Sequence, residues 1–218
     1  MARRKKDRNE FKAKKKNSEN LATPRLLLVT EGEMEDQGLP DFIRKLVAQD
    51  SLKFQVLSKT KRIHNGDTVP ATKIVKDLNK ICDVTLGADA EYIACVIDLE
   101  GRNCTSQEFE NDVKPNVTND KTVVGIASRS MENWILGDIT NMERTIRPCI
   151  APNHNNFRVP DNIPHPAERT LKRHWTKYRK TDDGVKFLKN VCPQNIREKS
   201  GSFLNFCNAL FAMNQNIA

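Results

Sequence analysis

The fold is decided by one stretch of the sequence, Tyr92-Ile93-Ala94-Cys95-Val96-Ile97-Asp98-Leu99-Glu100-Gly101. Its first part is apolar or aromatic without alternation, which predicts a strand buried on both faces. Two acidic residues and a glycine follow closely, and they predict a turn at the carboxyl end of that strand. Strands of this kind belong to parallel sheets that helices cover on both sides. The stretch therefore predicts an α/β fold.

Further strands and helices extend this prediction along the chain. The other apolar runs that read as strands are 25–30, 54–57 and 122–127. Between them, apolar residues recur at helical spacing in 39–47 and 74–82, and Ser130 precedes an acidic, apolar run typical of a helix start. Right-handed crossovers place such helices on both faces of the sheet. We therefore predict a central, mainly parallel, four-stranded sheet with helices on both faces.

The C-terminal third has a different composition. From Pro148 to Pro166 prolines and asparagines are frequent and periodicity is lost, which predicts a connector. Beyond it only helical patterns occur, so we expect a C-terminal helical appendage packed on the sheet domain. The predicted segments are a basic disordered arm at 1–22, the α/β domain at 23–147, the connector at 148–166 and a helical subdomain at 167–218.

The net charge of +8 is concentrated at the N-terminus. Residues 1–16 contain nine lysines and arginines against two acidic residues, a net of +7. Such a segment buries too little apolar surface to fold alone. We expect a disordered arm that attracts the phosphate backbone of a nucleic acid, although a purely solvating tail is the alternative.

Several classes of protein do not fit the sequence. No run approaches the roughly 20 apolar residues of a transmembrane helix, and the N-terminus lacks the apolar stretch of a secretory signal. The six cysteines form no C-x-x-C pair and the four histidines lack metal-ligand spacing, which disfavours a zinc site or a disulfide framework. Neither a P-loop nor a glycine-rich dinucleotide motif is present. We expect a cytoplasmic protein with no membrane partner and no nucleotide cofactor.

Acidic residues follow three of the predicted strands. Glu31 follows the first strand, and Glu132 comes one short turn after the last. Asp98 and Glu100 follow the strand at 92–97. Because the carboxyl ends of parallel strands meet at one edge of a sheet, these carboxylates should converge. Converging carboxylates repel one another unless a cation lies among them, and Mg²⁺ (or Mn²⁺) prefers oxygen ligands. The sequence therefore predicts a divalent metal site at this edge.

An acidic residue after a strand also has an ordinary structural explanation. It can cap a helix or interact favourably with the dipole of the first helical turn. Glu33 and Asp36 fit this explanation well. For Glu132 both explanations stay open, because Trp134 and Leu136 fit a common amphipathic helix.

Three blocks of the sequence resemble a known family. They are Val29-Thr30-Glu31-Gly32-Glu33-Met34-Glu35-Asp36, Val96-Ile97-Asp98-Leu99-Glu100-Gly101 and Ser130-Met131-Glu132-Asn133-Trp134-Ile135-Leu136-Gly137-Asp138. These look like the Glu-Gly, Asp-x-Asp and Ser-x-Glu blocks of Toprim domains, in particular of small bacterial Toprim-like proteins related to OLD-family nucleases and RloB. The resemblance covers residues 25–140, with weaker similarity at 178–184 and 201–206.

The resemblance implies a Toprim-like fold and roles for the acidic residues. Glu31 would act as an acid/base or contact the metal, and Glu132 corresponds to the extra acid of OLD-type sites. Toprim domains mostly carry Asp where this chain has Glu100, which leaves the number of ions open. The implied catalytic residues are Glu31, Asp98, Glu100 and Glu132, and the implied metal ligands are Glu31, Glu35, Asp98 and Glu100.

Basic residues in the arm and near the strand ends are candidates for nucleic-acid binding, although each alone is also explained as a solvated surface charge. They are Arg3, Arg4, Lys5, Lys6, Lys61, Arg62, Arg102 and Arg129. Cations beside the site would neutralise a phosphate and stabilise charge on the leaving oxygen. A further basic run at 172–180 contains Trp175 and Tyr178, whose helical spacing favours core packing over base stacking.

Together these features predict a metal-dependent endonuclease that hydrolyses phosphodiester bonds of DNA or RNA, with tRNA as one candidate substrate. A topoisomerase is disfavoured because Tyr92, inside a strand, and Tyr178 are the only tyrosines. The resemblance also implies an ATPase partner and a role in anti-phage defence. A catalytically silent Toprim-like docking or regulatory subunit, and a nucleic-acid-binding protein that works through its arm, stay open as alternatives. A homo-oligomer is equally compatible with the sequence.

Overall fold

The computed structural model describes residues 23–63, 69–139, 157–164, 166–175 and 177–217. A five-stranded sheet lies at its centre, and each strand pair in it is parallel. The strands are β1 (Arg25–Thr30), β2 (Gln55–Val56), β3 (Lys61–Arg62), β4 (Tyr92–Asp98) and β5 (Thr122–Ala127). They run in the order β2-β1-β4-β5, with β3 also paired to β1. The predicted α/β class with a mainly parallel sheet is confirmed.

The predicted count of four strands is wrong by one, because β3 lies in the segment 59–67, whose basic and turn residues predict a loop. Lys61 pairs with Val29 and Arg62 with Thr30 at the carboxyl end of β1. β2 pairs with the beginning of the same strand. A strand of two residues carries no periodicity, so its sequence cannot distinguish it from a loop.

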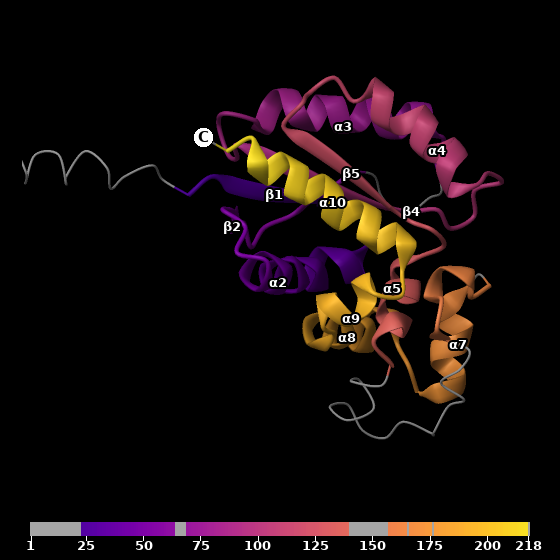
Figure 1. The fold of residues 1–218 in the computed structure, drawn as a ribbon. Helices are drawn as coiled ribbons and strands as arrows, with labels where there is room; N and C mark the ends of the chain where they lie inside the picture. The colour runs from indigo at the N-terminus through magenta and orange to yellow at the C-terminus, as the bar shows by residue number, and fades with distance from the viewer. Residues whose placement is uncertain (1–22, 64–68, 140–156, 165, 176, 218) are drawn as a thin grey trace, which may run out of the picture.

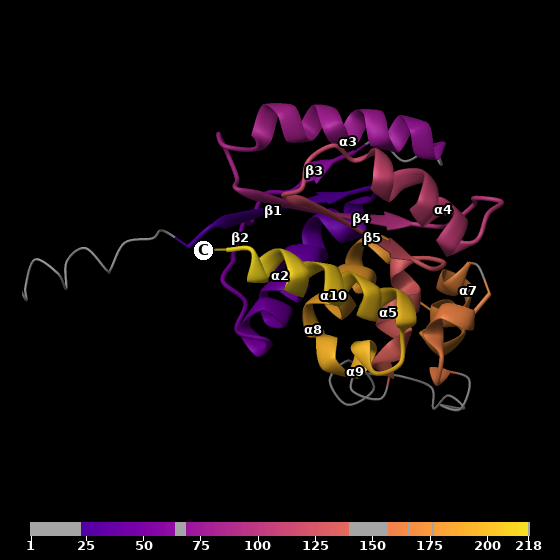
Figure 2. The ribbon, with the colours of Figure 1, turned by 45° about the horizontal axis from the view of Figure 1, so that its top comes forward.

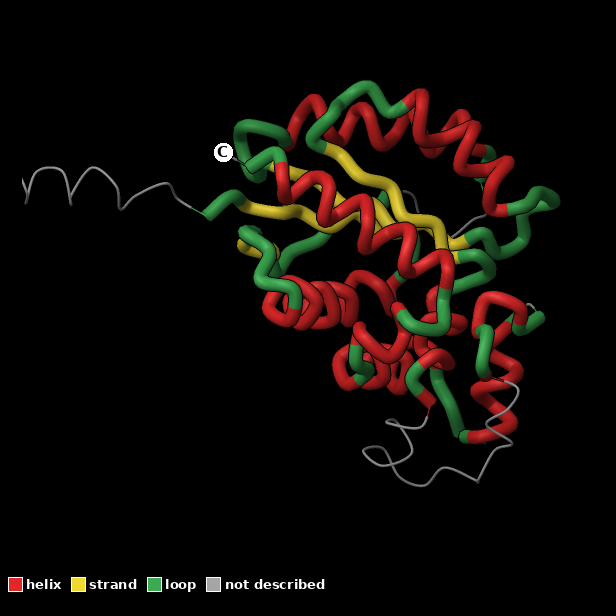
Figure 3. Tube along the Cα trace, in the orientation of Figure 1, coloured by secondary structure: helices red, strands yellow, loops and turns green. Residues whose placement is uncertain are grey.

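Helices cover both faces of the sheet, as Figures 1 and 2 show. One face carries α3 (Ala71–Thr85) and α4 (Ser106–Val113), and the other carries α2 (Glu33–Gln49) and α10 (Gly201–Gln215). Short helices lie on the same side of the sheet as α2, and Figure 3 shows how much of this region is helical. They are α5 (Met131–Gly137), α7 (Ala167–His174), α8 (Val185–Asn190), α9 (Pro193–Arg197), the 3-10 turn η3 (Pro160–Asn162) and the π-helical turn η4 (Lys180–Gly184); the 3-10 turn η1 (Lys114–Asn116) follows α4.

The two layers of helices pack on alternate side chains of the strands. Along β1, Leu26 and Leu28 join the core under α2 and α10, whereas Leu27 and Val29 join the core under α3. All four side chains are buried, with at most 3% of their surface exposed. Burial on both faces explains why the strand sequence is apolar without alternation.

The C-terminal helices pack on the sheet domain and share its core, as predicted for the helical appendage. On α10, Phe206 lies against Gly125 of β5, where an added Cβ would come within 2.4 Å of the ring. The ring of Phe203 lies 4.9 Å from that of Trp134 on α5. Residues from both predicted parts therefore belong to one hydrophobic cluster. The boundaries between the four predicted segments stay predictions.

Part of the predicted connector is held by α5. The side-chain amide of Asn133 donates hydrogen bonds to the carbonyl oxygens of Pro160 and Ile163, at 2.7 and 3.1 Å. The arm at 1–22 and the connector up to residue 156 lie outside the described residues. Among the described helices, none has the length and apolar character needed to cross a membrane.

A candidate metal site at the carboxyl ends of the strands

Three carboxylates meet at the carboxyl edge of the sheet. Asp98 is the last residue of β4, Glu100 follows in the next turn, and Glu132 lies in the first turn of α5, after β5. One oxygen from each lies within 4.8 Å of the other two. Three carboxylates that lie this close together could hold a metal ion.

The side chain and the backbone N–H of Asp98 are both held by hydrogen bonds with neighbouring elements. The backbone N–H of Met131, at the start of α5, donates to Asp98 Oδ1 at 2.9 Å. The backbone N–H of Asp98 itself donates to Glu31 Oε2 at 2.7 Å. Through these bonds the ends of β1 and β4 and the N-terminus of α5 are tied together.

Glu31 lies beside this cluster in a buried ion pair. Its Oε1 is 2.7 Å from Nη2 of Arg102, and the two side chains are only 14% and 7% exposed. The Arg102 guanidinium also donates to the carbonyl oxygen of Asp98 and lies 4.8 Å from the ring centre of Phe109. Glu31 and Asp98 therefore converge, as the sequence predicted, but Glu31 is not one of the three clustered carboxylates.

Glu35 points into the same region from the first turn of α2 and is 3% exposed. Neither of its carboxylate oxygens has a hydrogen-bond partner among the described residues. Burial raises the pKa of Glu35; Lys180 opposes this shift, and the Glu132 and Glu31 carboxylates add to it. Its carboxylate fits because residue 32 is a glycine: a Cβ on Gly32 would lie 2.2 Å from Glu35 Oε2.

Lys180 brings a positive charge into the cluster from the π-helical turn η4. Its Nζ lies 3.0 Å from Glu132 Oε1 and 4.0 Å from Glu100 Oε2. Burial lowers the pKa of Lys180, but the carboxylates of Glu132, Asp98 and Glu35 outweigh it, so that the pKa is raised overall. In the sequence Lys180 belongs to the basic run at 172–180, and that run does not indicate a place in the acidic cluster. The apolar stripe of Trp175 and Tyr178 just before it is the signal that this segment turns inward.

The charges at this edge do not balance. Among the described residues, five carboxyl groups face two cations, which leaves a formal excess of three negative charges. The groups are Glu31, Glu35, Asp98, Glu100 and Glu132 against Arg102 and Lys180. Burial, together with the Glu35 and Glu132 carboxylates, raises the pKa of Asp98 well above its usual value. A divalent cation would relieve this repulsion.

Unpartnered oxygen atoms support the fit of such a cation. Glu132 is 1% exposed, and its Oε2 has no hydrogen-bond partner among the described residues, like both oxygens of Glu35. Buried polar atoms are nearly always hydrogen-bonded, so orphaned ones need an explanation such as an ion. Because the donors are carboxylate oxygens, the set suits Mg²⁺ or Mn²⁺ better than zinc or copper.

The basic residues predicted to bind nucleic acid differ in their exposure and in their partners within the protein. Lys61 donates to Thr85 Oγ1 at 2.7 Å, Arg62 pairs with Asp36 at 3.0 Å, and Arg102 is buried against Glu31. Arg129 is exposed and forms no ion pair with the described residues. The other four candidates, Arg3, Arg4, Lys5 and Lys6, lie outside the described residues.

Comparisons with known proteins give one family and a group of solved structures. A family model described as "Domain of unknown function (DUF4276)" matches residues 30–211. The C-terminal region of the OLD protein of Burkholderia pseudomallei is similar, with 15% identity over 86% of this chain and 98% of that chain and a TM-score of 0.41. The corresponding region of the Xanthomonas campestris pv. campestris OLD protein is 15% identical over 89% of this chain and 98% of that chain, with a TM-score of 0.39. No curated protein matches the chain.

Proposed function

The chain belongs to the family described as a domain of unknown function, DUF4276, and we propose that it is a metal-dependent nuclease that hydrolyses phosphodiester bonds of DNA or RNA. One observation carries the proposal. Carboxylate oxygens of Asp98, Glu100 and Glu132 lie within 4.8 Å of one another in a partly buried site with an excess of negative charge, and buried oxygens of Glu132 and of the neighbouring Glu35 have no hydrogen-bond partner among the described residues. Sites of this kind bind divalent ions together with substrate phosphates.

Asp98, Glu100 and Glu132 are the residues that would hold the ion, with Glu35 as a further ligand. When bound, a divalent ion polarises a phosphate and lowers the pKa of an attacking water. The protein contributes rigidity, because the Met131 N–H fixes Asp98 and the Glu31–Arg102 pair fixes the end of β4. Carboxylates held in this way need little reorganisation when they bind a cation.

Glu31 serves best as a positioning residue. Its Oε1 accepts from Arg102 and its Oε2 from the backbone N–H of Asp98, so both oxygens are already engaged within the protein. Arg102 is likewise engaged, with Glu31 and the Asp98 carbonyl. This pair holds the strand ends together, and of the two cations at this edge that the structure describes, Lys180 is the one that faces the cluster.

Lys180 would stabilise negative charge on the reacting phosphate. Its ammonium group has three N–H donors, of which one is directed at Glu132 Oε1 at 3.0 Å. The raised pKa of Lys180 keeps the group charged, although burial by itself would lower that pKa. A fixed positive charge next to the acidic cluster favours the transition state over the ground state when it faces the phosphate oxygens that gain charge.

A second candidate function is a catalytically silent, Toprim-like docking or regulatory subunit. The specific observation in its favour is the Lys180–Glu132 contact, because an internal ammonium group offsets part of the charge that would otherwise attract a metal. An ATPase partner and a role in anti-phage defence belong to the proposal as well. They rest only on the resemblance of the three sequence blocks to Toprim proteins.

The proposal is tested by cleavage of plasmid DNA and of total RNA in the presence of Mg²⁺ or Mn²⁺. The wild type should cleave one of the two, and Asp98→Asn should not. Asp83→Asn is the matched control, because Asp83 is an exposed carboxylate on α3, on the far side of the sheet. Equal activity in all three proteins would indicate a contaminant, and a metal-binding but inactive wild type would favour the silent subunit.

A further inference from the structure

A basic surface lies on α7 and on the chain that flanks it on both sides. Between residues 157 and 180 the sequence has seven lysines and arginines against two acidic residues. Six of the seven cations are exposed, and only Lys180 turns inward. The exposed cations, which we call the α7 basic face, are Arg158, Arg169, Lys172, Arg173, Lys177 and Arg179.

The apolar side of α7 dictates which way this face points. Ala167 and Leu171 lie four residues apart on α7, Trp175 and Tyr178 follow its end, and each of the four side chains is at most 8% exposed. Trp175 is anchored against Phe187 of α8, with ring centres 4.7 Å apart. Because this stripe is fixed in the core, the cations on the opposite side of the helix must face solvent.

Several of these cations are available to a partner. Lys172 is paired with Glu168 at 2.6 Å and Arg179 with Asp182 at 2.7 Å. Arg169, Arg173 and Lys177 form no ion pair with the described part of the chain. Like charges gathered on one exposed helix repel one another, so an anionic partner is favoured there.

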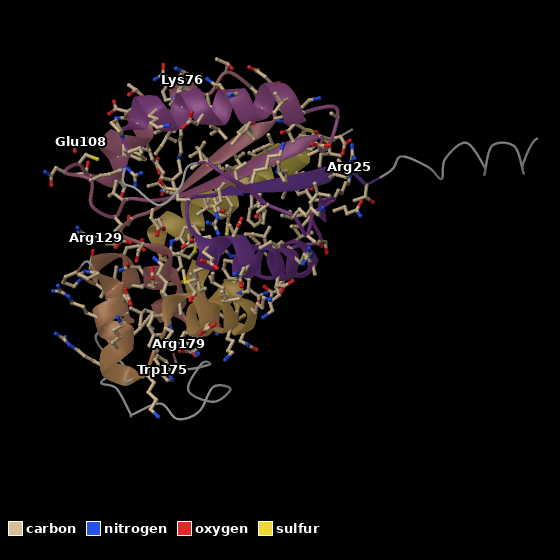
Figure 4. All side chains as sticks on the ribbon, turned by 180° about the vertical axis from the view of Figure 1, so that it is seen from behind. Arg25, Lys76, Glu108, Arg129, Trp175 and Arg179 are labelled. Atoms are coloured by element: carbon tan, nitrogen blue, oxygen red, sulfur yellow. The ribbon has the colours of Figure 1, made fainter. Side chains whose placement is uncertain are left out.

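The α7 basic face lies next to the candidate metal site. α7 contacts α5, the helix that carries Glu132, and the chain that leaves α7 enters η4, which carries Lys180. Figure 4 shows Arg129, another exposed cation, near one end of α7 and Trp175 near the other. A polyanion bound along this face would therefore continue towards the acidic cluster.

The side chains of the α7 basic face favour contacts with phosphates over contacts with bases. Among the described residues, the large apolar side chains that are exposed are Val84, Val159 and Leu204, and no aromatic side chain is exposed. Proteins that grip single-stranded nucleic acid usually add aromatic platforms on which bases stack. The α7 basic face offers cations without such platforms, which fits phosphates and not bases.

We propose that the α7 basic face binds the phosphate backbone of a nucleic acid and guides it to the acidic cluster. The inference deepens the proposed nuclease function, on which the guiding role rests, while the binding itself requires no catalysis. The eight residues of α7 span about 12 Å. Along that length a duplex carries roughly seven phosphate charges, so Arg169 and Arg173 on α7, with Lys177 just beyond its end, can each meet a phosphate.

The test is the salt dependence of binding for a triple variant, Arg169→Gln/Arg173→Gln/Lys177→Gln, in the full chain. A labelled duplex oligonucleotide is titrated without divalent metal, and fluorescence anisotropy gives the affinity at several salt concentrations. If three phosphate contacts are lost, the slope of log affinity against log salt becomes shallower by about 2.7 for a duplex. At ~0.1 M salt the affinity should fall on the order of a hundredfold.

The matched control removes the same charge from the other face of the sheet. Lys73→Gln/Lys76→Gln/Lys80→Gln takes three exposed cations from α3, where Figure 4 labels Lys76. This variant should keep the wild-type slope within about 1, because α3 makes no phosphate contact in the proposal. Equal losses in both variants, or no loss in the α7 variant, would overturn the inference.

Two further outcomes separate this inference from the nuclease proposal. If the α7 variant binds duplex normally but loses affinity for vesicles of anionic lipid, the surface serves a membrane and the inference is wrong. If the α7 variant loses binding while the wild type cleaves no nucleic acid, the surface assignment stands and the nuclease proposal fails. Affinity that depends strongly on base sequence would contradict a contact made through the backbone alone.

Discussion

Glu132 and Asp138 lie at the two ends of α5, and both are 1% exposed. The Asp138 carboxylate is satisfied: Oδ2 accepts from the Cys192 N–H at 2.7 Å and Oδ1 from the Asn195 amide at 2.6 Å. The Glu132 carboxylate has one oxygen on Lys180 and one with no partner among the described residues. The same chemical group, equally buried, is therefore complete at one end of the helix and incomplete at the other.

This difference indicates a structural role for Asp138 and a functional role for Glu132. A buried carboxylate whose oxygens are all hydrogen-bonded fixes neighbouring segments, as Asp138 fixes the chain around α9. A carboxylate buried without its full set of partners costs folding free energy, and such costs are tolerated where a ligand or ion completes the site. The comparison predicts opposite consequences for mutations at the two ends of α5.

The largest expected effect is the loss of catalysis in Glu132→Gln. The substitution keeps the size of the side chain and removes the charge that would bind the metal, so cleavage in Mg²⁺ should fall roughly a thousandfold. The fold should survive, because Glu132 has an oxygen with no partner to lose. Initial cleavage rates and circular dichroism spectra check both parts, and a loss below tenfold would remove Glu132 from the site.

The opposite result is expected for Asp138→Ala. The Cys192 N–H and the Asn195 amide lose their charged acceptor, so the free energy of unfolding should drop by about 3 kcal/mol. Urea denaturation measures the drop. Cleavage by the fraction that remains folded should match the wild type, and a selective loss of activity at full stability would break the distinction between the two ends of α5.

A smaller and opposite change in stability is expected for Glu35→Met. The substitution keeps the length of the side chain and removes two buried oxygens that have no partner among the described residues. The metal-free variant should be more stable than the wild type by about 1–2 kcal/mol. Urea denaturation in the presence of a chelator is the measurement, and a clear destabilisation would mean that Glu35 has a structural partner.

The smallest expected effect is a pH dependence of the metal-free protein. Burial and the neighbouring carboxylates raise the pKa of Asp98 above its ordinary 3.8, so the folded state binds a proton more tightly than the unfolded state. Stability should therefore be highest below about pH 4 for this group and decline as the pH rises towards the raised pKa. Lys180 stays charged and offsets part of the decline.

Denaturation midpoints at several pH values should show this slope in the wild type and a weaker slope in Asp98→Asn. The uncharged amide removes the group that titrates. An identical slope in the two proteins would assign the pH dependence to other residues.

Much of the site could be predicted from the sequence because it follows from topology. Strands buried on both faces leave apolar runs, and acidic residues directly after them meet at one edge of a parallel sheet. Asp98, Glu100 and Glu132 meet there for this reason. Their proximity required no knowledge of side-chain packing.

The remaining features depend on packing that the local sequence does not encode. Lys180 reaches the cluster because η4 lies against α2, where a Cβ on Gly184 would come within 2.3 Å of the Met34 sulfur. The pairing of Glu31 with Arg102 likewise joins two loops whose relative position is set by the sheet. β3 escaped prediction because a two-residue strand is defined only by its neighbour in the sheet.

Calorimetric titration of the metal-free protein with Mn²⁺ shows whether the acidic cluster binds a divalent ion. The wild type should bind Mn²⁺ with release of protons, because an ion displaces protons from carboxyl groups whose pKa is raised. Glu132→Gln should lose this binding, whereas the exposed-site control Asp83→Asn should keep it. Undetectable binding to the wild type, or equal binding to wild type and Glu132→Gln, would contradict the metal site.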